Sequence, residues 1–145
     1  MVTTGAAGPS KSFRIIEADR CFRMKPEALP NHAPAIPGIY EFVTFDDQQN
    51  AKVLFVAWSG PLSIANCLEE HLSGRRQPAV AELLKTHGNL YFDFVLLQGK
   101  PPQEDWQDVL WALAQQHKPP YNDPNAIAHS NRFSTIELTP INSSA

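Results

Sequence analysis

The stretch Gly38–Ser59, which reads GIYEFVTFDDQQNAKVLFVAWS, decides the fold that we expect for this chain. Two runs rich in β-branched and aromatic residues, 39–45 and 52–58, favour strands. The polar residues 46–50 between them have the composition of a hairpin loop slightly longer than two residues. We therefore predict a β-hairpin from Ile39 to Trp58.

The residues after this hairpin predict a helix, a second helix, a strand and a third helix. One apolar stripe ends at Gly74, and a shorter helix is predicted for 78–87 with Gly88 as its cap. Residues 90–97 are almost continuously apolar and indicate a central strand. Acidic residues at 104 and 105 and prolines at 119 and 120 delimit the last helix. The order β-β-α-α-β-α predicts an α+β domain with a small three-stranded, mostly antiparallel sheet flanked by helices.

The 145 residues, 43% of them hydrophobic, suffice for one domain with one core. We expect a disordered lead in 1–12, an N-terminal extension packing on the core in 13–36, the main domain in 37–125 and a C-terminal extension in 126–145. Within the last segment, 132–138 is predicted to add a strand at the sheet edge or to pair with another chain. The polar end from residue 141 is expected to be mobile.

Charge and cysteine usage limit the function classes. The longest apolar run, 53–58, is far shorter than the ~20 residues of a membrane helix, and no secretory signal opens the sequence. Cys21 and Cys67 are too few for a disulfide framework, so we expect reduced thiols in a soluble, cytoplasmic protein without a membrane partner. Residues 37–125 carry six basic and eleven acidic side chains, which disfavours nucleic acid as the partner.

Four short motifs then resemble a known family, and one of them is the stretch 83–94, in which a helix end and a glycine precede a strand. Gly38-Ile39-Tyr40 and Phe55-Val56-Ala57 resemble the two signature strands of the GIY-YIG nuclease domain, and 117–122 (HKPPYN) is similar to its closing motif. The resemblance covers about 37–125. It implies the GIY-YIG fold and, for an intact member, a metal-dependent endonuclease.

The sequence departs from that family where the chemistry is done. The resemblance implies a tyrosine on each signature strand, a helix arginine and a glutamate that binds a divalent metal. Tyr40 is present, but Phe55 replaces the second tyrosine, Ala65 or Cys67 replaces the arginine and Leu110 replaces the glutamate. A leucine offers no oxygen to a hard cation. We therefore expect a degenerate scaffold with no metal ligand and no cofactor, and Mg²⁺ or Mn²⁺ only for a nuclease with a rearranged site.

Two sets of candidate site residues follow. A relocated catalytic site would use Tyr40, His71, Arg75 and Glu104, with Asp108 as a further carboxylate. The same residues at helix ends are also explained as partners of the helix dipole. The cleft or binding residues that we predict are Tyr40, Phe55, Trp58, Ser59, Arg75, Arg76 and Asn122.

The sequence leaves three functions open. The first is a non-catalytic interaction or regulatory module on a degenerate GIY-YIG scaffold, with a protein partner. The alternative is a divalent-metal-dependent endonuclease with a rearranged active site. The second alternative is a nucleic-acid binder that does not cut, which would need Arg75, Arg76 and Lys85 on one face.

Overall fold

A computed structural model describes residues 1–141. It is α+β, as predicted, but the expectation of a small three-stranded sheet is wrong. The sheet has seven strands and is mixed and curled. Its main path runs β1 (Val2–Thr3), β7 (Thr135–Pro140), β2 (Ser10–Glu17), β6 (Tyr91–Leu97), β4 (Ile39–Phe45) and β5 (Ala51–Trp58), and β3 (Phe22–Arg23) also pairs with β6.

The additional strands come from the two extensions. Strand β2 pairs with β6 in antiparallel orientation, and β7 lies parallel to β2 with Phe13 opposite Leu138. The structure also places β1 within the lead that we expect to be disordered, because Val2 pairs with Ile136 of β7. Local sequence patterns do not reveal a parallel pairing between segments so far apart in the chain. Residues 142–145 of the expected mobile end lie outside the described part.

Residues 39–117 follow the predicted order of elements. The hairpin β4–β5 leads into α2 (Ile64–Ser73) and α3 (Val80–His87), then β6, then α4 (Gln103–His117). The Ser63 side chain accepts a hydrogen bond from the Asn66 N–H at the start of α2, and Gly74 ends that helix in the left-handed region. Two single-turn elements, the 3₁₀ turn η1 (Pro26–Ala28) and α1 (Leu29–His32), precede the hairpin.

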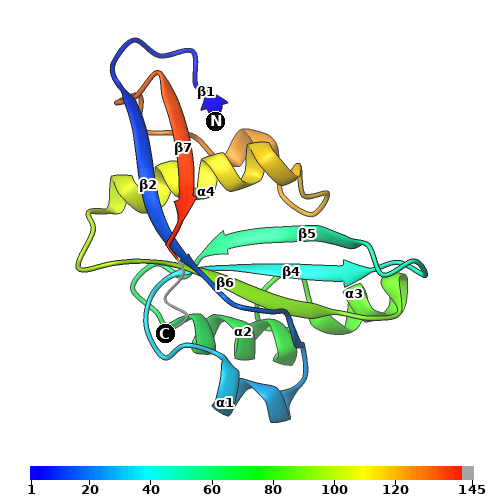
Figure 1. The fold of residues 1–145 in the computed structure, drawn as a ribbon. Coiled ribbons are helices and arrows are strands. Elements are labelled where there is room, and N and C mark those ends of the chain that lie inside the picture. The colour runs from blue at the N-terminus through cyan, green and yellow to red at the C-terminus, as the bar shows by residue number, and fades with distance from the viewer. Residues whose placement is uncertain (142–145) are drawn as a thin grey trace.

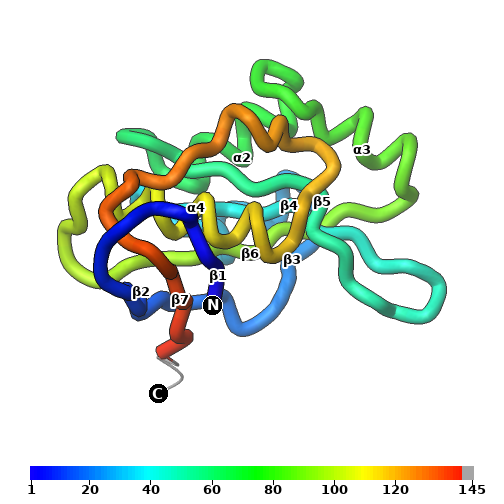
Figure 2. Tube along the Cα trace, turned by 90° about the horizontal axis from the view of Figure 1, so that it is seen from above, coloured from blue at the N-terminus to red at the C-terminus, as the bar shows by residue number. Residues whose placement is uncertain are grey.

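The sheet separates two apolar cores. On one face, α1, α2 and α3 pack against the sheet around Tyr40, Phe42 and Phe92. On the other face, α4 lies inside the curl formed by β1, β7 and β2 (Figures 1 and 2). Alternate residues of β4 therefore enter different cores, and this alternation decides which side chains can meet.

Gly38 fixes the entry to the hairpin through close packing. A Cβ at this position would lie 2.7 Å from side-chain atoms of both Ile64 and Leu96, and 3.2 Å from the Val95 carbonyl oxygen. The Gly38 N–H donates to Ser59 Oγ at 3.0 Å, and the Ser59 N–H donates to the Gly38 carbonyl at 2.9 Å. The start of β4 and the end of β5 are thereby joined beside α2.

None of the helices in residues 1–141 is long and apolar enough to cross a bilayer.

Candidate functional site

Tyr40 and His71 meet in the interior. The Tyr40 hydroxyl lies 2.7 Å from His71 Nε2, and the other ring nitrogen, Nδ1, lies 2.9 Å from the Pro78 carbonyl oxygen. A carbonyl only accepts, so Nδ1 carries the proton and Nε2 accepts from the tyrosine. Tyr40 is 1% exposed and His71 is fully buried. Both hydrogen-bonding groups are satisfied internally.

The surroundings of this pair are aromatic. Phe42 and Phe55 stack with ring centroids 5.8 Å apart, and both rings pack against His71. Burial lowers the pKa of His71 and raises that of Tyr40. At neutral pH the imidazole and the phenol are therefore uncharged. The sequence predicted Tyr40, Phe55 and His71 as site residues, and the structure brings them together as packing.

The predicted basic residues lie elsewhere. Arg75 is exposed and donates to Ser73 Oγ at 2.8 Å, and Arg76 forms an ion pair with Glu70 at 2.6 Å. Glu104 is exposed in the first turn of α4, on the opposite face of the sheet from α2 (Figure 1). The residues of a relocated catalytic site are thus divided between two faces.

Trp58 and Ser59, two predicted cleft residues, lie at the end of β5. The Trp58 ring faces the α4 side and stacks on Trp106, with centroids 6.4 Å apart and planes at 14°. Ser59 is buried, and its hydroxyl accepts a hydrogen bond from the Gly38 N–H. The Trp58 ring does not lie beside the Tyr40 hydroxyl, because Tyr40 enters the opposite core.

The residues that depart from the GIY-YIG pattern have apolar surroundings in the structure. Cys67 is fully buried in the core beneath α2, and Ala65 is half-buried on the same helix. Leu110 packs against the core around α4, on the other face of the sheet. No charged group replaces the expected arginine or glutamate at these positions.

Asp108 anchors the chain that follows α4. Its carboxylate accepts from the Ser130 N–H and hydroxyl and from Arg132, each at 2.7 Å. Arg132 also reaches Asp105 at 3.0 Å. Asp108 is 1% exposed, and both of its oxygens are occupied by these donors. Within residues 1–141, no group of three or more His, Cys, Asp or Glu side chains is arranged to hold a metal ion.

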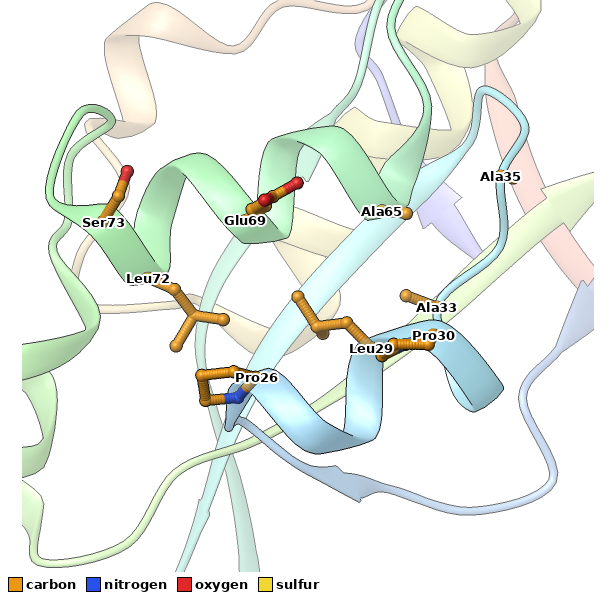
Figure 3. A pocket seen from close by; sticks show the side chains of 9 residues that line it. All are labelled: Pro26, Leu29, Pro30, Ala33, Ala35, Ala65, Glu69, Leu72 and Ser73. Carbon is orange, nitrogen blue, oxygen red and sulfur yellow. The ribbon is translucent and has the colours of Figure 1, made fainter.

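A groove between α1 and α2 is the first of two cavities of interest. Its volume is about 550 Å³, and Figure 3 shows Leu29 and Leu72 projecting into it from the two helices. Prolines 26 and 30 and alanines 33, 35 and 65 complete apolar walls. Glu69 on α2 supplies the one charged side chain among the residues that line it. We call this cavity the α1–α2 groove.

The second cavity, on the other face of the sheet, was not predicted from the sequence. It has a volume of about 500 Å³ and lies between the curled sheet and the last turn of α4. Glu41 of β4 and Asp93 of β6, which are directly opposite in register, both line it. Asp93 is the one polar residue within an apolar strand and could have indicated this cavity, but only the strand register shows that it lies opposite Glu41.

Comparison with known proteins found no family model, no curated protein and no solved structure that matches this chain. The fold and the geometry of these sites therefore carry the functional argument alone, and the GIY-YIG resemblance stays a prediction.

Proposed function

We propose that this chain is a non-catalytic interaction module that binds a protein partner through the α1–α2 groove. The partner chemistry that fits is a peptide segment with apolar side chains and a basic residue. The proposal assigns the module to the cytoplasm, where its free thiols Cys21 and Cys67 stay reduced.

The burial of the Tyr40–His71 pair carries this proposal. A general base must reach the proton that it removes, and an activated hydroxyl must reach the substrate. Both groups are instead enclosed in an aromatic core and hydrogen-bonded to each other. A nuclease would also need a cation or arginine beside them to stabilise the transition state. Arg76, the basic residue whose charge acts on Tyr40, is engaged by Glu70.

The chemistry of the α1–α2 groove supports a peptide as the occupant. Its volume of about 550 Å³ falls in the range of ligand-binding clefts, and its walls are mostly proline, leucine and alanine. Glu69 is exposed at this groove without an ion-pair partner among the described residues. An apolar anchor with a neighbouring lysine or arginine complements both features, and the acidic balance of residues 37–125 adds long-range attraction.

Panning a displayed library of random peptides on the full chain tests the proposal. We expect selected peptides to combine an apolar anchor with a basic residue and to bind, by fluorescence anisotropy, with weakened affinity at high salt. Ala65→Glu should abolish binding because it places a charged side chain in the groove. Asn66→Glu is the matched control, since it adds the same charge at the next, exposed position of α2.

Glu69→Lys gives the second criterion. It should reverse the preference from basic to acidic peptides. The proposal fails if the selected peptides bind Ala65→Glu as well as the parent, or if Glu69→Lys leaves the preference unchanged. Cleavage of plasmid, single-stranded DNA or RNA with Mg²⁺ or Mn²⁺, abolished by Tyr40→Phe, would instead support the endonuclease. Steeply salt-dependent binding of nucleic acid without cutting would support the third function.

A further inference from the structure

Three acidic side chains line the cavity inside the curl, and none of the described residues that line it is a lysine or an arginine. Glu41 and Asp93 are directly opposite on neighbouring antiparallel strands, so both side chains leave the sheet on the same face. Glu41 is 5% exposed. Its Oε2 and Asp93 Oδ1 are buried and receive no hydrogen bond from any third residue among 1–141, so that a proton shared between the two carboxyls is their internal partner. Buried carboxylates are normally paired, so such an arrangement is costly to stability.

The other titratable groups at this cavity do not neutralise the pair. From α4, His117 Nε2 lies 3.8 Å from Glu41 Oε2, beyond hydrogen-bond distance. Burial lowers the pKa of His117, so its ring stays neutral at pH 7. From the loop after β2, Cys21 Sγ lies 3.8 Å from Asp93 Oδ2, and Glu17 of β2 adds a further acid. The residues of β5 and β7 at this cavity are apolar.

The size and the walls of the cavity indicate the kind of ligand. A volume of about 500 Å³ falls in the range of small-molecule sites. Aliphatic side chains of the surrounding strands and of α4 form most of the walls, among them Ile15, Val53, Leu113 and Leu138, and Gln116 of α4 adds an amide. Such a site has an acidic floor and apolar walls. It suits a positively charged head group joined to a short hydrocarbon body.

We propose that this cavity is a binding site for a small organic cation, an alkylammonium or alkylguanidinium, whose charged head contacts the carboxylates of both Glu41 and Asp93 from the cavity side. Each head group donates several hydrogen bonds, which satisfy the two carboxylate oxygens that receive none from a third residue. A hard divalent cation fits less well, because among the described residues no group of three or more His, Cys, Asp or Glu side chains is arranged to hold one. The site lies on the opposite face from the α1–α2 groove and is independent of it.

Proton linkage follows from this placement. Burial, and then the negative charge of Asp93, raises the pKa of Glu41 well above its ordinary value, and burial raises that of Asp93. Without a cation the pair therefore binds a proton more readily than ordinary carboxyls do, and a bound cation displaces that proton. Affinity should rise with pH, by up to about tenfold per pH unit while one proton is released per ligand bound.

The test is isothermal titration calorimetry of the full chain with n-butylguanidinium, n-butylammonium and, as the neutral control of similar size, n-butanol. We expect saturable binding of at least one cation, weaker binding of n-butanol, and higher affinity at pH 8 than at pH 5. In two buffers of different ionisation enthalpy, the cation should release protons. Glu41→Gln should weaken cation binding at least tenfold and remove its pH dependence.

Glu82→Gln is the matched control, because Glu82 is exposed on α3 and lines neither cavity. Its cation affinity should equal that of the parent. Thermal unfolding confirms that the Glu41→Gln protein is folded, and Asp93→Asn offers a second neutral variant if it is not. The inference is overturned if the cations bind no better than n-butanol, or if Glu41→Gln and Asp93→Asn leave cation binding unchanged.

Discussion

The Asn122 side chain is paired with the backbone of Val56 through two hydrogen bonds of opposite direction. The Val56 N–H donates to Asn122 Oδ1 at 2.9 Å, and Asn122 Nδ2 donates to the Val56 carbonyl at 2.8 Å. The Tyr121 N–H also donates to the Leu54 carbonyl at 3.0 Å. Because β5 is the last strand of the sheet, this segment covers groups that would otherwise be available to another chain.

Replacement of Asn122 by alanine is expected to destabilise the protein by about 1–3 kcal/mol, since both Val56 groups lose their partner. Asn122→Asp keeps an acceptor for the Val56 N–H but places a second oxygen against the Val56 carbonyl. It should be no better than alanine. Urea denaturation measures both variants, and aggregation rates test whether the edge of β5 has become available. An unchanged unfolding midpoint would contradict the structural role of Asn122.

Tyr40→Phe is expected to cost about 1–3 kcal/mol, because His71 Nε2 would lose its donor in the interior. Tyr121→Phe is a close control. The Tyr121 hydroxyl also lies 2.9 Å from a histidine, His87, but this contact is exposed, so its loss should cost much less. Equal effects of the two substitutions on the free energy of unfolding would contradict the importance of burial.

The pH dependence of stability tests the neutral state of His71. Its pKa is lowered in the folded protein by burial, so the unfolded chain binds more protons. The contribution of His71 is complete above its unfolded pKa of about 6.5, and it is lost as pH falls from there towards the lowered folded value. Ring NMR signals of His71 should titrate with a midpoint below 6.5. A midpoint at or above 6.5 would refute this account.

Glu41→Gln should act in the opposite direction. A carboxyl whose pKa is raised by folding contributes fully at pH values below its unfolded pKa, and that contribution is lost as pH rises through the folded value. The neutral amide avoids this loss. At pH 8 the variant should therefore have a larger free energy of unfolding than the parent, by about 1.4 kcal/mol for each tenfold increase in proton affinity that folding imposes on Glu41. Urea denaturation should show this difference between variant and parent at pH 8 and no difference near pH 4.

Asp108→Asn should loosen the chain after α4. The substitution removes the charge that Arg132 meets at 2.7 Å, at an expected cost of about 1–3 kcal/mol. Asp105→Asn should cost less, because Asp105 is more exposed and makes one contact with Arg132. Amide hydrogen exchange of residues 127–134 should accelerate in the first variant more than in the second. Equal exchange rates in the two variants would contradict the role of Asp108 in holding this segment.

The parts of the fold that depend on local chemistry could be predicted from the sequence. Side-chain type and the polar loop defined the hairpin between Ile39 and Trp58, and Gly74 and Gly88 marked helix ends that the structure has in the left-handed region. The parallel pairing of β2 with β7 could not be predicted, because each segment is short and its partner is distant in sequence. A count of strands from local patterns was therefore too small.

The candidate sites followed the same division. Tyr40, Phe55 and His71 do come together, although the sequence predicted Tyr40 and His71 as candidate catalytic groups and Phe55 as a cleft residue, and the structure uses all three as packing. The Glu41–Asp93 pair was missed. Its meaning arises from the register between β4 and β6 and from the position of α4, and neither can be read from one segment alone.

The pairing of β1 with β7 imposes an order on the folding of this protein during its synthesis. Val2 can join the sheet only after Ile136 has been synthesised, and until then β2 also lacks its parallel neighbour β7. The hairpin β4–β5 and the helices α2 and α3 are synthesised before β7. Translation therefore exposes an unfinished sheet edge until its last strand emerges, and a circular permutant that begins at β7 would remove this delay.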